Sequence, residues 1–146
     1  MSLLAEIPSL APYEPSILAL AILCLAVMLQ TFALAPLAYL KEEQVPGIPL
    51  RGGHELFSFR VIRTHLNSVE NLPVFGFSLA VAILAGSGPT LVNALAAIHV
   101  VFRLAFWGVY YSGVGNVAGG LRSICFTGGA LANLVLIGVS LYSLIA

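Results

Sequence analysis

Charged residues are so rare in this sequence that they leave stretches long enough to cross a lipid bilayer. Ser16 to Leu40 is a run of 25 residues without a charge, and Asn71 to Phe102 is a run of 32 that Gly86-Ser87-Gly88-Pro89 interrupts. Leu104–Leu121 and Ser123–Ala146 also carry no charge. Because a helix of roughly 20 apolar residues spans the hydrocarbon core, the sequence predicts transmembrane helices.

The composition excludes several classes of protein. Of the 146 residues, 60% are hydrophobic and only 8% are charged, whereas an ordinary soluble domain carries about 25% charged residues. So few polar groups do not coat the surface of a cytosolic globular domain of this length. Six Lys and Arg balance six Glu, so no basic excess is available to bind nucleic acid.

The charge-free runs, and the Pro- and Gly-rich segments that separate them, predict an all-α fold. We expect an integral membrane four-helix bundle that forms a single domain over residues 1–146, with helices at about 15–40, 57–85, 90–112 and 120–145. Pro46-Gly47-Ile48-Pro49 ends the first helix region, and Gly86–Pro89 forms a short turn. The first helix is not a cleaved signal, because Glu6 and Glu14 precede it instead of basic residues.

The basic residues predict the orientation of the bundle. Lys41, Arg51, Arg60 and Arg63 lie in or near the first loop, and Arg122 lies beside the third. By the positive-inside rule, the first and third loops face the cytoplasm and both termini face outward.

The two cysteines do not point to a redox or metal site. Cys24 and Cys125 lie inside apolar stretches, where cysteine behaves as a small hydrophobic residue. No Cys/His cluster has the spacing of metal ligands, so we expect neither a disulfide framework nor a bound metal.

Polar residues inside the predicted helices are spaced to share faces. On the second helix these are Arg60, Arg63, Asn67, Glu70 and Asn71, which fall on one face at about 100° per residue. A charge within a spanning helix costs at least about 2.5–3.5 kcal/mol and normally faces the bundle interior.

The third and fourth helices repeat this pattern. His99, Arg103, Phe106 and Tyr110 are spaced 4, 3 and 4 residues apart, and Arg122-Ser123 opens the fourth helix. Together the helices predict one polar pocket, cationic on balance, that opens at the cytoplasmic membrane surface.

Structural roles are the alternative for several of these residues. Arg60 fits an interfacial anchor with its head group in water, and Glu70 fits a partner that neutralises Arg63 or Arg103. Structural roles alone are expected for His65, His99, Trp107, Tyr111 and Asn133.

The residue types of the pocket indicate its ligand. Arginines bind carboxylates in a fork geometry, a buried Glu accepts from an ammonium group, and Asn both donates and accepts. Glutathione, with two carboxylates, an amine and a thiol, fits this set. Nearby positive charge lowers the pKa of a thiol and favours the thiolate, which can attack an apolar electrophile dissolved in the bilayer.

The second-helix residues Phe59–Phe75 also resemble a family signature. Their pattern, R-x-x-R-x-x-x-N-x-x-E-x-x-P from Arg60 to Pro73, is similar to that of the MAPEG family, the membrane-associated proteins in eicosanoid and glutathione metabolism. Arg103 with Tyr110 resembles the family's third helix. Arg122-Ser123 resembles the pair that opens the fourth helix of the prostaglandin E synthase branch.

The resemblance implies a homotrimer with glutathione between neighbouring subunits, open to the cytoplasm. Arg63, Asn67, Glu70 and Tyr110 would bind glutathione, with Arg60, Asn71 and Arg103 completing the cofactor-binding set. Arg122 would stabilise the thiolate, with Ser123 beside it. Family activities are glutathione transfer and glutathione-dependent peroxidase and isomerase reactions on lipophilic substrates.

The sequence also departs from the eicosanoid enzymes of the family. Leu66 replaces an Arg just before the Asn, and Phe106 and Phe126 replace residues with polar side chains. The spacer between Tyr110 and Arg122 is longer, and Lys41 is the nearest substitute for an Arg at the end of the first helix. These departures favour a general detoxifying transferase or peroxidase of a bacterial inner membrane.

Two rival functions remain at this stage. A non-catalytic lipid- or partner-binding protein of the same fold would keep an apolar groove but lose the thiolate-activating arginine, whereas Arg122 is present here. A small transporter or channel is less consistent with four helices that lack an internal repeat.

Overall fold

The first charge-free run forms a helix whose winding changes partway along. The computed structural model describes residues 9–40, 42–115 and 119–145, so Lys41 lies outside it. A 3₁₀ turn, η1 (Ala11–Tyr13), leads into α2 (Glu14–Leu29), a π-helical segment η2 (Gln30–Leu34) and α3 (Ala35–Leu40). The stretch expected as a helix at about 15–40 is thus helical along its length, with π winding over Gln30–Leu34.

Pro36 and Gln30 account for this π segment. Proline has no N–H to donate, and its ring crowds the carbonyl four residues earlier, so a regular ladder cannot pass Pro36 unchanged. The π turn also carries a buried glutamine, because Gln30 is only 3% exposed and its Nε2 donates to the Tyr111 hydroxyl at 2.6 Å.

The remaining helices are continuous. They are α4 (Phe57–Leu84), α5 (Pro89–Ser112) and α6 (Leu121–Ile145), in place of the expected ranges 57–85, 90–112 and 120–145. Gly86 has φ 67° in the turn between α4 and α5, and Gly113 has φ 71° where α5 ends, a conformation that glycine adopts without strain. Proline begins α5, where its missing N–H costs nothing.

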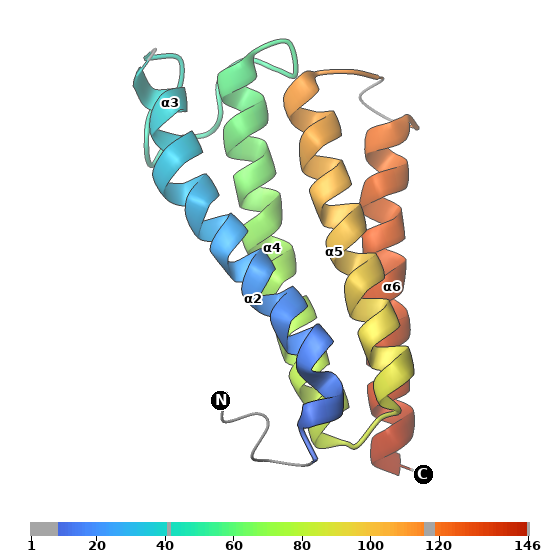
Figure 1. The fold of residues 1–146 in the computed structure, drawn as a ribbon. Coiled ribbons are helices and arrows are strands. Elements are labelled where there is room, and N and C mark those ends of the chain that lie inside the picture. Colours follow the sequence, from blue (N-terminus) through green and yellow to red (C-terminus); the bar gives the residue numbers. More distant parts are fainter. Residues whose placement is uncertain (1–8, 41, 116–118, 146) are drawn as a thin grey trace.

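The helices form a bundle with two distinct ends (Figure 1). The start of α2, the α4–α5 turn and the end of α6 lie at one end, here called the turn end. The start of α4, the end of α5 and the start of α6 lie at the other, here called the loop end. Within the described residues, four helical stretches are long and apolar enough to cross a membrane.

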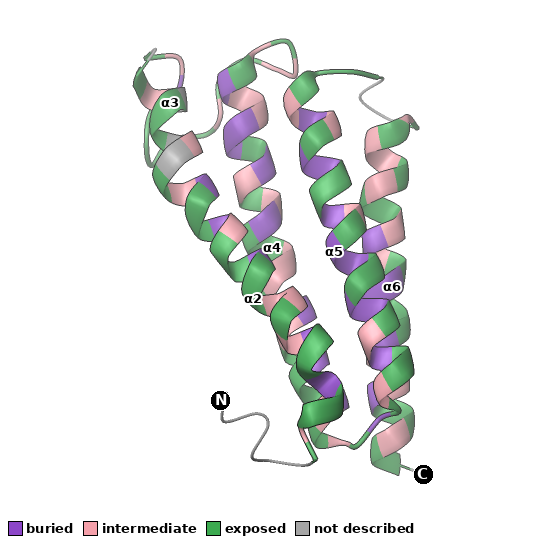
Figure 2. Cartoon of the chain, in the orientation of Figure 1, coloured by how far each residue is buried: buried purple, intermediate pink, exposed green. Residues whose placement is uncertain are grey.

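Helices α2, α4, α5 and α6 each carry both buried and exposed residues (Figure 2), and many large apolar side chains are among the exposed ones. Phe75, Leu79, Val92 and Leu136 are at most 1% exposed and fill the centre of the bundle. Large side chains such as Phe77, at 75% exposure, point outward. Such a surface is unfavourable in water and suited to hydrocarbon, which agrees with a membrane-spanning bundle.

Hydrogen bonds hold the helices together at the turn end. Asn93 on α5 donates from Nδ2 to the Pro12 carbonyl at 2.8 Å, and its Oδ1 accepts a hydrogen bond from the Ser16 hydroxyl. The Tyr13 hydroxyl donates to the Ser87 carbonyl, and the Ser87 hydroxyl donates to Ser143 at 2.8 Å. The first helix is thus fixed to α5 and α6 at a point distant from the loop end.

Replacing Asn93 tests how much this clamp stabilises the bundle. In Asn93→Ala the Ser16 hydroxyl, which is fully buried, loses its partner. We expect the free energy of unfolding to fall by about 1–3 kcal/mol, the usual cost of an unsatisfied buried polar group. Thermal unfolding in detergent, followed by circular dichroism, measures the change. Ser78→Ala is the control, because that hydroxyl donates within its own helix, and equal stability of the two variants would contradict the clamp.

Candidate functional site

A polar hollow lies at the loop end, between α4, α5 and α6. Its volume is about 240 Å³, and it is lined by His54, Arg63, Asn67, Phe106, Tyr110 and Arg122. The lining therefore draws on three helices and the loop before α4, and among its described residues it contains two arginines and no carboxylate. Such a hollow is suited to an anionic group.

Arg122, Tyr110 and His54 form one contact cluster in this hollow. Arg122 donates from Nη1 to His54 Nδ1 at 3.0 Å, and its guanidinium lies 4.7 Å from the centre of the Tyr110 ring. The Tyr110 hydroxyl is 3.1 Å from the same His54 nitrogen. Because a guanidinium has only donors, His54 Nδ1 is the acceptor and carries no proton here.

His54 is the lining residue that the sequence analysis missed. Burial and the nearby Arg122 lower the pKa of His54 below its usual 6.5, which keeps the ring neutral at pH 7. Helical spacing cannot find it, because His54 precedes α4 and belongs to no helix face. Its position after Gly52-Gly53, where a turn delivers the chain to α4, is the one local signal available.

Arg103 lies behind the hollow and supports one of its walls. It is only 3% exposed, and its Nη2 donates to Asn67 Oδ1 at 2.7 Å. Its guanidinium also lies 5.0 Å from the centre of the Phe106 ring. Because Arg103 occupies the amide oxygen, Asn67 retains its NH₂ donors for an acceptor in the hollow.

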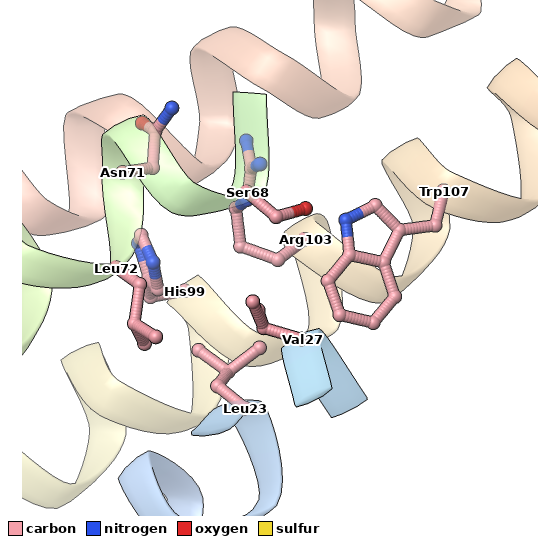
Figure 3. A pocket seen from close by; sticks show the side chains of 8 residues that line it. All are labelled: Leu23, Val27, Ser68, Asn71, Leu72, His99, Arg103 and Trp107. Carbon is pink, nitrogen blue, oxygen red and sulfur yellow. The ribbon is translucent and has the colours of Figure 1, made fainter. Parts of the chain in front are cut away.

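Asn71 faces a separate interior space (Figure 3). With Ser68, His99, Arg103 and Trp107 it lines a void of about 10 Å³, which is too small for a ligand larger than a water molecule. Asn71 Nδ2 donates to the Asn67 carbonyl at 2.7 Å. Asn71 therefore belongs to the support of the hollow and not to its lining.

His99, expected to be structural, is part of the bundle interior. It is 2% exposed, its Nδ1 lies 2.9 Å from the Gly129 carbonyl, and its ring stacks on Phe75 at 4.2 Å. These contacts join α5 to α6 and α4 across the middle of the bundle.

Arg60 holds the loop before α4 in place. Its Nη1 donates to the carbonyls of His54 at 2.7 Å and Glu55 at 3.1 Å. A Cβ at position 113 would lie 3.0 Å from the Arg60 Cζ, so Gly113 makes room for the guanidinium. Arg60 shares a small adjoining space with Arg122 but does not line the main hollow.

The polar stripe on α4 spans a wider arc than one cavity covers. Relative to Arg60, Asn71 lies about 20° to one side, while Asn67, Arg63 and Glu70 lie about 20°, 60° and 80° to the other. Arg63 and Glu70 are accordingly exposed, and of these two only Arg63 lines the hollow. Within one chain the stripe is therefore divided between the hollow and its surroundings, and a single pocket for the whole stripe stays a prediction.

Ser123 faces a different groove from its neighbour Arg122. Its hydroxyl accepts a hydrogen bond from the Gly119 N–H at 3.2 Å, and it lines a groove of about 390 Å³ with Phe102, Gly119, Ile124, Thr127, Gly128 and Leu131. Consecutive residues on a helix diverge by about 100°, so an adjacent pair cannot be expected to face the same space. Ser123 is therefore not beside the Arg122 head group within one chain.

Comparison with known proteins identifies the family of this chain. No curated protein matches the chain. The model of the MAPEG family matches residues 16–142, which is most of the chain. The match includes most of each of the four stretches within the described residues that are long and apolar enough to cross a membrane, and we conclude that the chain is a multi-pass integral membrane protein that belongs to the MAPEG family.

Proposed function

We propose that this protein is a membrane-embedded glutathione-dependent transferase or peroxidase that acts on lipophilic electrophiles. The observation that carries the proposal is the convergence of Arg122 and Arg63 on one polar hollow beside Asn67 and Tyr110. Among the described residues, no carboxylate lines this hollow. Membership of the MAPEG family is consistent with glutathione as the ligand.

The residues of the hollow have complementary roles toward glutathione. Arg63 binds a carboxylate of the tripeptide, and the Asn67 amide donates to a backbone carbonyl or carboxylate. Glutathione supplies a thiol nucleophile. Arg122 lowers the pKa of that thiol by favouring its charged form, and Tyr110 lies against the Arg122 guanidinium.

The position of Glu70 favours a site that a second copy of the chain completes. It is exposed on α4, and within a membrane a carboxylate that faces hydrocarbon is costly unless another group covers it. In the homotrimer that we propose, Glu70 binds the ammonium group of glutathione at the boundary with a neighbouring subunit. Ser123 faces the same kind of boundary from its own groove.

The groove that contains Ser123 suits the second substrate. Phe102, Ile124 and Leu131 give it apolar walls. A lipophilic electrophile that is dissolved in the bilayer can enter such a groove without losing favourable apolar contacts. We propose that the electrophile binds here and that this hollowed surface lies beside the glutathione site in the assembled protein.

The first prediction concerns the thiolate. Arg122→Ala removes the cation that stabilises it, so kcat for conjugation should fall at least about 100-fold, while the Kd of glutathione rises by less than about tenfold. Absorbance assays with chlorodinitrobenzene and titration calorimetry measure the two quantities. Arg51→Ala, in an exposed part of the loop, is the control.

Two outcomes would contradict this function. Wild-type turnover in Arg122→Ala would remove the arginine from the mechanism. Glutathione binding by the wild-type protein without turnover of any electrophile would favour the non-catalytic alternative.

The second prediction concerns binding. Glu70→Gln removes the charge that we assign to the ammonium group, and the Kd of glutathione should rise about tenfold or more, the usual effect of losing a hydrogen bond to a charged group. Titration calorimetry in detergent measures it. Glu42→Gln, which alters an exposed loop carboxylate, should bind like wild type, and equal affinities for both variants would exclude Glu70 from the site.

The third prediction concerns orientation in the membrane, which we propose is a bacterial inner membrane. Arg51 lies in the loop before α4, Arg60 and Arg63 lie near the start of α4, and Arg122 lies at the start of α6. The positive-inside rule therefore places the loop end in the cytoplasm. With Cys24 and Cys125 replaced by alanine, a cysteine at Val45 should resist an impermeant thiol reagent in intact cells, whereas a cysteine at Gly88 should react. The reverse pattern would invert the orientation.

A further inference from the structure

We infer that His54 is a positioning residue that holds the Arg122 guanidinium in its place in the hollow through an unprotonated Nδ1. The inference rests on the proposed function, because it names the residue on which the thiolate-stabilising arginine depends. It starts from the 3.0 Å contact between Arg122 Nη1 and His54 Nδ1.

Tyr110 and Phe59, together with Arg122, hold the His54 ring. The Tyr110 hydroxyl lies 3.1 Å from Nδ1, the Phe59 ring packs edge-on at 5.1 Å between centroids, and the Tyr110 ring lies at 5.5 Å. Arg60 binds the His54 carbonyl at 2.7 Å and so fixes its backbone as well. A loop residue held at both backbone and ring is able to set the position of a long, flexible arginine.

An arginine at the end of a hollow needs such support. Its side chain loses considerable rotamer entropy when it is fixed, and the Tyr110 ring constrains only the face of the guanidinium. His54 fixes one edge, so the remaining N–H groups keep a defined direction. The arrangement thereby contributes electrostatic preorganisation toward negative charge in the hollow.

The support depends on the charge state of His54. Arg122 on α6, Arg63 and Arg60 on α4, Tyr110 on α5 and Glu55 in its own segment are the ionisable groups that act on it. A proton on Nδ1 would remove the acceptor and place a third cation beside Arg122 and Arg63. The hollow therefore requires neutral His54, and its burial favours that state.

The test compares two substitutions at one position. His54→Phe keeps a ring but removes the acceptor, whereas the amide oxygen of His54→Asn replaces Nδ1 and does not titrate. We expect His54→Phe to raise the pKa of the thiol of bound glutathione by about one unit and to lower kcat about tenfold. The Kd of glutathione should change by less than about threefold. His54→Asn should restore the pKa and kcat.

Thiolate absorbance of the bound tripeptide, titrated against pH in the intact detergent-solubilised protein, gives the pKa. As the pH is lowered, kcat/KM should fall more steeply in wild type than in His54→Asn, because in wild type both His54 and the glutathione thiolate become protonated. His65→Asn is the matched control, since His65 does not line the hollow, and it should behave like wild type.

The outcomes separate this inference from the proposed function. A wild-type thiolate signal that His54→Phe leaves unchanged overturns the positioning role alone. The positioning role is also overturned if His54→Asn does not restore the thiol pKa and kcat that change in His54→Phe. It is overturned as well if kcat/KM falls equally steeply at low pH in wild type and in His54→Asn. Absence of any thiolate signal in the wild-type protein overturns the proposed function and, with it, the role of His54.

Discussion

The cost of placing a guanidinium inside an apolar bundle governs how the polar residues are arranged. Arg103 is almost completely buried among helices whose other contacts are largely apolar, and such a charge persists only where acceptors surround it. Asn67 provides its carbonyl and amide oxygens, and Phe106 offers a ring face. In meeting this need, the bundle also fixes two side chains that line the hollow.

The arginines nearer the loop end are also held by neighbouring acceptors and rings. Arg60 donates from Nη1 to two loop carbonyls, and Arg122 contacts His54 and Tyr110. Carbonyl, imidazole and aromatic groups on neighbouring segments thus help to fix both arginines.

The sequence was sufficient to predict what depends on composition and period. The all-α class, the spanning helices and the family follow from charge-free runs and from the Arg60–Pro73 pattern, because hydrophobic length and helical spacing are local properties. Arg63, Asn67, Tyr110 and Arg122 were identified for the same reason, and the structure brings all of them to one hollow. Their chemical roles remain predictions.

What escaped prediction depends on packing between elements. The π turn at Gln30 reflects both Pro36 and a partner on another helix, and His54 reaches the hollow only through the path of a loop. The division of the α4 stripe into half-buried Asn71, which lines an interior void, and exposed Glu70 depends on where the neighbouring helices lie. Spacing defines an arc on a helix, but it does not show which part of the arc a neighbour covers.

The first turn of α6 separates two environments of opposite polarity. Arg122 points to a hollow lined mainly by polar groups, and Ser123, one residue later, points to a groove walled by apolar ones. In the function that we propose, reactants of opposite solubility would reach this turn by independent routes, one from water and one from the bilayer. A product that joins the polar reactant to the apolar one is amphiphilic. Its release, as well as its formation, would then depend on how the hollow and the groove meet at this helical turn.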